Sequence, residues 1–354
     1  MCGGVIGLSA ASLAGVACSS AYGTDVADAS DEGGADAAPE AAVDDGGADS
    51  ALDGATKAEA GSLAFVLASG LGELGGISAT ETYVYFTVRK APGILSGGVS
   101  RVAIAGGMVE PVVPGGAESA PGAIVAADTT VTWLDPGAGA VYRKNLAMGG
   151  GTTSLLLGKS PPLVTMAATT DLVAVASGGM AVPGGVQAYD GNLVSAGAIS
   201  STSDPFDITL VGNTVWWTSP TTQEVGRAAL VGAIHIPFAN ETDCQYIAAD
   251  ANGAYWTRPS AGLVRAYAAG PDKVLTLSAT ENAPSAIAVD DTGLYWLTGN
   301  GTLRRKRLDQ ELPPATLDQG FSSAFAGAHV DAIALTSKYV VWLTTDGRIL
   351  RLDK

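Results

Sequence analysis

The chain has 354 residues, of which 47 are glycine and only 15% are charged, and its formal net charge is −16. Few charges, many glycines and scattered Val, Thr, Trp and Tyr favour many short strands joined by glycine turns over amphipathic helices. The sequence offers no basic patch for phosphate contacts, which argues against a nucleic-acid partner.

The first segment, residues 1–23, is predicted to be an export signal. An apolar, small-residue stretch of about 17 residues precedes Cys18, which suits the hydrophobic region of a secretory signal better than a membrane span. Residues 15–20, GVACSS, resemble a bacterial lipoprotein signal, which implies lipidation of Cys18 after cleavage; Gly15 departs from the usual Leu, Val or Ile. The alternative is an ordinary signal cleaved near Ala21. A basic start is missing, so either the true start lies upstream of Met1 or the segment is not a signal.

The next segment is strongly acidic. Residues 24–59 contain eleven acids, one lysine and no aromatic residue, so they carry ten of the sixteen net negative charges. Such a segment cannot bury enough apolar surface to offset its chain entropy. We therefore predict a disordered, self-repelling tether over residues 24–60 and a folded domain over residues 61–354.

Cysteine usage adds little chemistry. Cys2 and Cys18 fall in the predicted signal, which leaves Cys244 alone in the folded domain. One cysteine provides neither a disulfide framework nor a thiol metal site. We expect Cys244 to be a small buried hydrophobe in a strand.

An apolar anchor followed nine residues later by a second large residue recurs seven times in the folded domain. Six of the seven second positions are aromatic, although only 6% of the chain is aromatic. Successive anchors lie 39 to 47 residues apart, a spacing typical of four-stranded propeller blades. The pairs are Ile77 and Phe86, Ile124 and Trp133, Met166 and Val175, Ile208 and Trp217, Ile247 and Trp256, Ile287 and Trp296, and Ile333 and Trp342. The repeat predicts an all-β, seven-bladed β-propeller.

Each copy divides into four strands. In the sixth copy, residues 285–290, 293–298, 302–309 and 313–320 are the predicted inner, second, third and outer strands. The last copy reaches Lys354 after only three strand-like runs, and one unassigned run, residues 62–70, precedes the first copy. We predict that this N-terminal run is the outer strand of the seventh blade and closes the ring without exposed sheet edges.

Three residues of the fifth copy carry a family resemblance. Tyr255, Trp256 and Thr257 resemble the YWTD motif of propellers in low-density-lipoprotein-receptor-like proteins, and residues 62–354 are also similar to bacterial NHL-type propellers. In the YWTD pattern an aspartate follows and ties the blade by hydrogen bonds, whereas here the residue is Arg258. The resemblance implies the architecture and not the receptor function. Together with the lipoprotein-like start and the acidic tether, the chain resembles bacterial β-propeller lipoproteins of the cell envelope.

Polar residues gather just before the anchors, in the loops from an outer strand to the next inner strand, where propellers build a funnel. They are Glu118, Asp204 with Asp207, Glu241 with Asp243, Glu281 with Asn282, and His329 with Asp331. From these the sequence-based candidates for ligand binding are Glu118, Asp204, Asp243, Glu281, Asn282, His329 and Asp331. If they converge, a ring of carboxylates would hold a cation such as Ca²⁺, or a basic or polyhydroxy ligand. Loop acids also cap turns, and this structural role is the alternative.

We therefore expect an exported, lipid-anchored propeller that acts as a ligand-binding or protein-interaction module. Its expected location is the cell envelope, anchored in the outer membrane or in the periplasmic or extracellular space. Its expected partner is an envelope protein, a peptide or a carbohydrate; it touches membrane only through the anchor, is a monomer, and has Ca²⁺ as its one candidate cofactor.

Two other functions stay open. One is a lactonase-like hydrolase or lyase with a metal at the funnel mouth, and the other is a structural envelope component. An enzyme needs at least two titratable groups near one substrate position, so convergence of the carboxylate and histidine loops separates it from a simple binder.

Overall fold

The computed structural model describes residues 63–90, 97–114, 120–147, 149–179, 182–200, 204–229, 236–268, 273–323 and 330–354. These residues form strands, turns and loops, and no segment among them is a helix long and apolar enough to cross a membrane. The predicted signal over residues 1–23, with Cys18, and the predicted tether over residues 24–60 lie outside the described residues.

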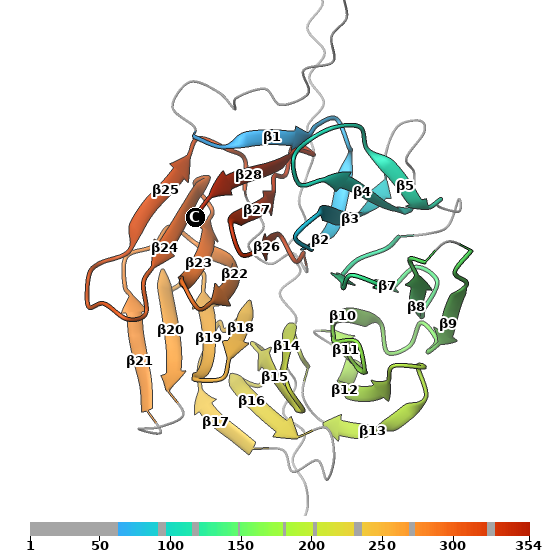
Figure 1. Cartoon of the computed structure of the whole chain (residues 1–354). Helices are drawn as coiled ribbons and strands as arrows, with labels where there is room; N and C mark the ends of the chain where they lie inside the picture. Colours follow the sequence, from blue (N-terminus) through green and yellow to red (C-terminus); the bar gives the residue numbers. More distant parts are fainter. Residues whose placement is uncertain are drawn as a thin grey trace, which may run out of the picture. The chain divides into compact units, whose positions relative to one another are not determined.

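The strands form seven antiparallel four-stranded sheets arranged in a ring, so the predicted seven-bladed β-propeller is confirmed (Figure 1). Blade 1 is β2 (Glu73–Ala79), β3 (Tyr83–Lys90), β4 (Val99–Ala103) and β5 (Glu110–Val113), and blade 2 is β6 (Ile124–Ala126), β7 (Thr130–Asp135), β8 (Ala140–Asn145) and β9 (Thr152–Leu156). Blade 3 is β10 (Leu163–Ala168), β11 (Leu172–Gly179), β12 (Val182–Asp190) and β13 (Ser195–Ser200), and blade 4 is β14 (Asp207–Val211), β15 (Thr214–Ser219), β16 (Glu224–Ala229) and β17 (Ile236–Asn240).

The remaining blades follow the same order from the inner to the outer strand. Blade 5 is β18 (Ile247–Asp250), β19 (Gly253–Arg258), β20 (Leu263–Ala268) and β21 (Lys273–Ser278), and blade 6 is β22 (Pro284–Asp290), β23 (Gly293–Thr298), β24 (Thr302–Lys306) and β25 (Ala315–Gln319). Blade 7 is β26 (Ile333–Leu335), β27 (Tyr339–Leu343), β28 (Ile349–Asp353) and, as its outer strand, β1 (Phe65–Ala68). In blade 6 the third strand ends at Lys306, three residues before the predicted end, because the chain turns at residues 308–310.

The nine-residue spacing of the repeat corresponds to the pairing register of the first two strands in each blade. In every blade the anchor of the inner strand is the direct cross-strand partner of the residue nine positions later, from Ile77 opposite Phe86 to Ile333 opposite Trp342. Directly opposed residues on antiparallel strands have side chains on the same face of the sheet. The repeated pair therefore places one large aromatic side chain per blade against the adjoining blade, with Val175 as the exception.

The tryptophans of the second strands are the largest fully buried side chains. Trp217, Trp256, Trp296 and Trp342 expose none of their surface. Burying one such side chain contributes roughly 2–3 kcal/mol of transfer free energy. Next to Trp217, the opposing residue on β16 is Gly226, where a Cβ atom would come within 2.5 Å of the indole ring. The glycine leaves room for the tryptophan.

In five blades, within the described ranges, a polar side chain caps the tight turn after the inner strand. The carboxylate of Asp290 accepts hydrogen bonds from the backbone N–H groups of Thr292 and Gly293. In blade 7 the hydroxyl of Thr336 accepts the backbone N–H groups of Lys338 and Tyr339. Asp and Thr are frequent in turns because their oxygens satisfy backbone donors of this kind.

The N-terminal strand closes the ring as predicted. Phe65 lies opposite Arg351 and Val66 opposite Leu350 on β28, in an antiparallel ladder. The guanidinium group of Arg351 lies 5.2 Å from the centre of the Phe65 ring, and its Nη1 donates to the backbone oxygen of Ile104 in blade 1. One arginine therefore joins the closing strand, the last strand and the neighbouring blade.

A point substitution in β1 tests whether this strand stabilises the closed ring. Leu67 is 3% exposed, and Leu67→Ala should lower the free energy of unfolding by about 2–4 kcal/mol, because it removes buried apolar surface and leaves a cavity in the closing blade. Leu63→Ala is the matched control; Leu63 is 62% exposed, and its replacement should change stability by less than about 0.5 kcal/mol. Urea denaturation measures both, and equal midpoints for the two variants would contradict a stabilising role for β1.

Candidate functional site

The seven inner strands surround a central channel with a cavity of about 330 Å³. Every blade contributes to its wall through β2, β6, β10, β14, β18, β22 or β26. All seven anchors of the repeat line it: Ile77, Ile124, Met166, Ile208, Ile247, Ile287 and Ile333. The size falls at the lower end of the range for small-molecule sites.

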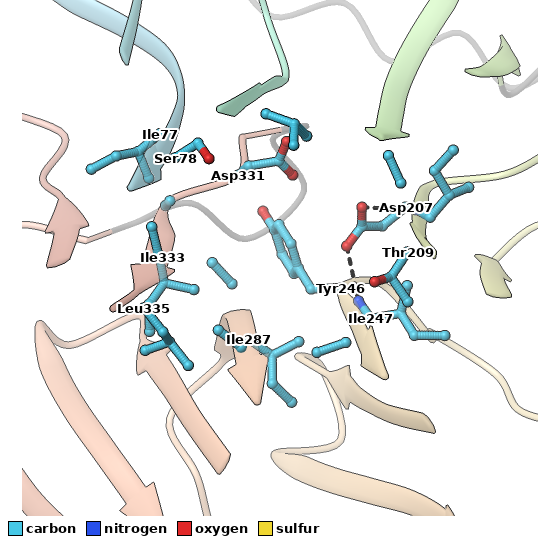
Figure 2. Close-up of a pocket in the computed structure, with 18 of the residues that line it drawn as sticks. Ile77, Ser78, Asp207, Thr209, Tyr246, Ile247, Ile287, Asp331, Ile333 and Leu335 are labelled. Carbon is cyan, nitrogen blue, oxygen red and sulfur yellow. Dashed lines mark hydrogen bonds between the residues drawn. The ribbon is translucent and has the colours of Figure 1, made fainter. Parts of the chain in front are cut away.

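Three ionisable side chains gather at one end of this channel. Asp207 is the first residue of β14, Tyr246 immediately precedes β18, and Asp331 lies two residues before β26. All three therefore lie where inner strands begin, and Figure 2 shows their side chains around the same part of the channel. We call these three residues the acidic end of the channel.

The Asp207 carboxyl group is buried, with 8% of the residue exposed. Its Oδ1 accepts the N–H of Ile208 at 2.8 Å, and its Oδ2 accepts the N–H of Ile247 in the next blade at 2.9 Å. Burial raises the pKa of Asp207 well above its ordinary value and the nearby Asp331 raises it further, while the two N–H groups lower it. Asp207 thus links two blades and also faces the channel.

Asp331 is held through its backbone. Its carbonyl oxygen accepts the N–H of Ile77 at 3.0 Å, in an isolated parallel bridge between Asp331 and Gly76 that joins blade 7 to blade 1. The side chain is partly accessible and lines the channel. Desolvation raises the pKa of Asp331 to about 6, and the positive charge of Arg89 acts in the opposite direction. Both carboxyl groups therefore keep their protons to a higher pH than an exposed aspartate does.

Tyr246 completes the acidic end. It is 3% exposed, and its ring packs edge-on against Phe206 at 5.4 Å between ring centres. Burial raises the pKa of its hydroxyl, and the charges of Asp207 and Asp331 raise it further. The phenol is therefore neutral at physiological pH.

This arrangement suits two kinds of chemistry. The charge of Asp331 raises the pKa of Asp207, so double ionisation is disfavoured and the pair would be stabilised by an added cation or by a shared proton. Carboxyl groups with a raised pKa are also the usual means of proton transfer at neutral pH. Among the described residues, no three His, Cys, Asp or Glu side chains gather into a group that could hold a metal ion.

Two of the sequence-based candidates serve turns. Asp204 accepts the hydroxyl of Thr221 at 3.0 Å. Asp243 accepts the N–H of Ser260 at 2.5 Å and the side-chain amide of Gln245 at 3.3 Å. Neither residue lines the channel. Each joins the loop before an inner strand to the turn between the second and third strands of the same blade.

Two further candidates lie at the joint between blades 5 and 6. Glu281 accepts the hydroxyl of Ser278 at 2.6 Å and forms an ion pair with Arg304 at 3.5 Å. The backbone oxygen of Asn282 accepts the N–H of Gly299 at 2.8 Å. Of the candidates in the described part of the chain, only Asp331 lines the channel. Glu118 and His329 lie outside the described residues.

Sequence reasoning named Asp207 as a neighbour of Asp204 but did not select it, and it missed Tyr246 entirely. Both residues directly precede an anchor isoleucine, Ile208 and Ile247. That position lies at or immediately before the start of an inner strand, and in both cases its side chain reaches the channel. Asp204 and Asp243, three positions earlier, reach the turns instead. A search of the position before each anchor would have found both.

Cys244 is a buried free thiol, as expected for a small hydrophobe. It is fully buried, and its Sγ donates to the backbone oxygen of Glu224 at 3.3 Å. Burial raises the pKa of the thiol to about 12, so it is not a reactive thiolate. It lies in the loop before β18, not within a strand.

The chain matches no protein-family model and no curated protein. Solved structures of other proteins share its architecture. A streptogramin B lyase is 15% identical with a TM-score of 0.61 and covers 81% of this chain and 95% of its own, and virginiamycin B lyase from Staphylococcus aureus is 13% identical with a TM-score of 0.61 and covers 82% and 98%. PorZ, an essential bacterial surface component of the type IX secretion system of Porphyromonas gingivalis, is 11% identical with a TM-score of 0.59; the match covers 81% of this chain and 37% of PorZ. At these identities the likeness shows the propeller fold alone.

The raised pKa values make stability depend on pH in a defined direction. Between about pH 4 and pH 7 the folded chain holds more protons at Asp207 and Asp331 than the unfolded chain, so stability falls as pH rises through this range. Below this pH range both carboxyl groups are protonated in the folded and in the unfolded chain. Above it both are ionised, and the folded chain bears the full free-energy cost of placing the two charges at the channel. The melting temperature of Asp331→Asn minus that of the native chain should therefore be more positive at pH 8 than at pH 4.

Asp309→Asn is the control for this measurement, because Asp309 is an exposed carboxylate whose pKa is lowered by its hydrogen bond with Arg307. Thermal melts at pH 4, 6 and 8 for the three proteins provide the comparison. Curves for the native chain and Asp331→Asn that stay parallel across pH would show that Asp331 ionises as freely as in the unfolded chain.

Proposed function

We propose that this chain is an exported, lipid-anchored β-propeller that acts as a binding module, and that its ligand presents a positively charged group to Asp207 and Asp331. The observation that supports this most is the acidic end of the channel. Two carboxyl groups from different blades face one cavity large enough for a small ligand. The propeller supplies a rigid frame for them, since both lie where inner strands begin.

The electrostatics favour a cation over other ligands. No salt bridge within 4 Å involves either carboxyl group among the described residues, the positive charge of Arg89 acts on Asp331 alone, and the hydrogen bonds to Asp207 come from neutral backbone N–H groups. A buried carboxylate costs free energy unless it is paired. A ligand cation would pair with both groups and favour their charged forms, so its binding energy would include the relief of this cost. Ca²⁺ and an ammonium or guanidinium group of a peptide are both candidates.

The location rests on the sequence. Residues 15–20 resemble a lipoprotein signal with Cys18 as the lipidated residue, and an acidic, low-complexity segment follows up to the propeller. A charged segment of this composition extends by self-repulsion and would hold the domain away from a negatively charged membrane surface. We propose that the protein is a monomer of the cell envelope, with a protein, peptide or carbohydrate of the envelope as its partner.

Binding of simple cationic probes tests the function. Calcium chloride or a tetralysine peptide should raise the melting temperature of the native chain in a saturable manner at pH 7.5 and 0.15 M salt, and Asp331→Asn should abolish most of this shift. Removal of one carboxyl group of the pair is expected to weaken binding about tenfold or more, as for a charge-assisted contact. A tetraglutamate peptide should have no effect.

Asp309→Asn is the matched control, since it removes one exposed carboxylate and leaves the channel unchanged. Mass spectrometry of the peptide after incubation separates binding from turnover. If neither cation shifts the melting temperature, or if both shift the native chain and Asp331→Asn equally, the channel is not a cation site.

The anchor is tested separately at Cys18. Native protein taken from bacterial membranes should partition into the detergent phase and carry acyl chains on Cys18, detected by mass spectrometry of its N-terminal peptide. The variant Cys18→Ala should partition into the aqueous phase. An unmodified N-terminus near Ala21 in the native protein would instead indicate an ordinary cleaved signal.

A further inference from the structure

The wall of the channel carries backbone hydrogen-bonding groups as well as side chains. Each inner strand is the terminal strand of its sheet and pairs on one side only, with the second strand of its blade. Its other edge therefore faces the channel. Some N–H groups of these edges donate to a neighbouring blade, as that of Ile77 does to Asp331 and that of Ile247 to Asp207, and the other N–H and C=O groups have no partner strand in the sheet. Seven such edges surround one cavity, so carbonyl acceptors occur at successive depths below the acidic end.

The side chains between these backbone groups are small. Below the acidic end the wall consists mainly of alanine, at Ala79, Ala168, Ala249, Ala288 and Ala334 among others, together with the isoleucine anchors. Two hydroxyl side chains interrupt it. Ser78 uses its Oγ to accept the N–H of Ala126 in blade 2, and Thr209 lines the channel from β14 (Figure 2). The wall is thus mainly apolar and carries these two hydroxyl groups.

We propose that the channel binds a linear polyamine, with one primary ammonium group at Asp207 and Asp331 and the remaining amino groups directed along the channel toward backbone carbonyl oxygens of the inner strands. This inference rests on the proposed cation-binding function and names its ligand class. An ammonium group has three N–H donors and no acceptor, which matches carboxylates and carbonyl oxygens. The methylene segments between amino groups contact the alanine and isoleucine side chains.

Other cations use fewer of these features. A single ammonium group or a calcium ion would pair with the carboxyl groups but would leave the strand edges and the alanine wall in water. A guanidinium group is planar and best recognised by a bidentate carboxylate, whereas the carboxyl oxygens of Asp207 already accept two backbone N–H groups. A chain with several ammonium groups uses both the acidic end and the wall.

The test is a series of amines measured by isothermal titration calorimetry on the full chain at pH 7.5 and 0.15 M salt. We expect spermidine to bind at least about tenfold more tightly than n-butylamine, with 1,4-diaminobutane between them, because each added ammonium group gains a charge-assisted hydrogen bond. Asp331→Asn should weaken all three amines. Ala288→Leu places extra side-chain volume in the channel wall and should reduce the affinity for spermidine toward that of n-butylamine, which it should leave unchanged.

Comparison between the variants also cancels the contribution of the acidic segment to amine binding. Residues 24–59 attract polyamines by charge alone, but they are identical in all variants, so the informative quantity is the difference between proteins. Asp309→Asn should behave as the native chain. If Ala288→Leu unfolds, Ala334→Val provides a smaller obstruction at another position of the wall.

The outcomes separate the two proposals. Equal affinities for spermidine and n-butylamine, or an unchanged spermidine affinity in both wall variants, would overturn the polyamine inference. If calcium or tetralysine binds and depends on Asp331 while the amines do not bind, the cation-binding function stands and the ligand class is wrong. If no cation depends on Asp331, both proposals fail.

Discussion

The contact on which the rest of the molecule depends is the cross-strand pair between an inner-strand anchor and the large residue opposite it. It recurs in every blade, and four of its members are tryptophans without exposed surface. A single blade has no partner for such a side chain, since it lies on a face of the sheet. Only the adjoining blade covers it, so the apolar faces are satisfied when the sheets close into a ring. The central channel is a product of that closure.

This dependence explains how much the sequence could predict. The period of the repeat, the number of blades and the closure by an N-terminal strand follow from patterns along the chain, because the pair has a fixed separation of nine residues. Even the register was implicit, since Ile287 and Trp296 can face each other only across a tight turn such as the one that Asp290 caps. Local periodicity and global architecture coincide in repeat proteins.

The site was harder to predict, for a geometric reason. Asp207, Tyr246 and Asp331 belong to three blades and lie at slightly different distances from their anchors, so no linear motif links them. The loops before the inner strands contain many acids, and most in the described part of the chain satisfy backbone donors or arginines, as Asp243 and Glu281 do. Composition identified an acidic face, but only the direction of each side chain separates turn caps from channel residues. An offset of a few residues from the anchor decides between these roles.

The short pairing of β1 with β28 also determines how the ring responds to mechanical load. The segment through which the protein would be held enters the propeller at β1, whose ladder with β28 contains three register pairs and a bulge. A force transmitted through that segment would load the hydrogen bond from the N–H of Leu63 to Asp318 of β25 and then this ladder. The remaining six blades are each continuous in sequence, so none of them depends on a strand from the far end of the chain. The strand that completes the ring is therefore also the strand that such a force would pull away from its sheet, which would open blade 7.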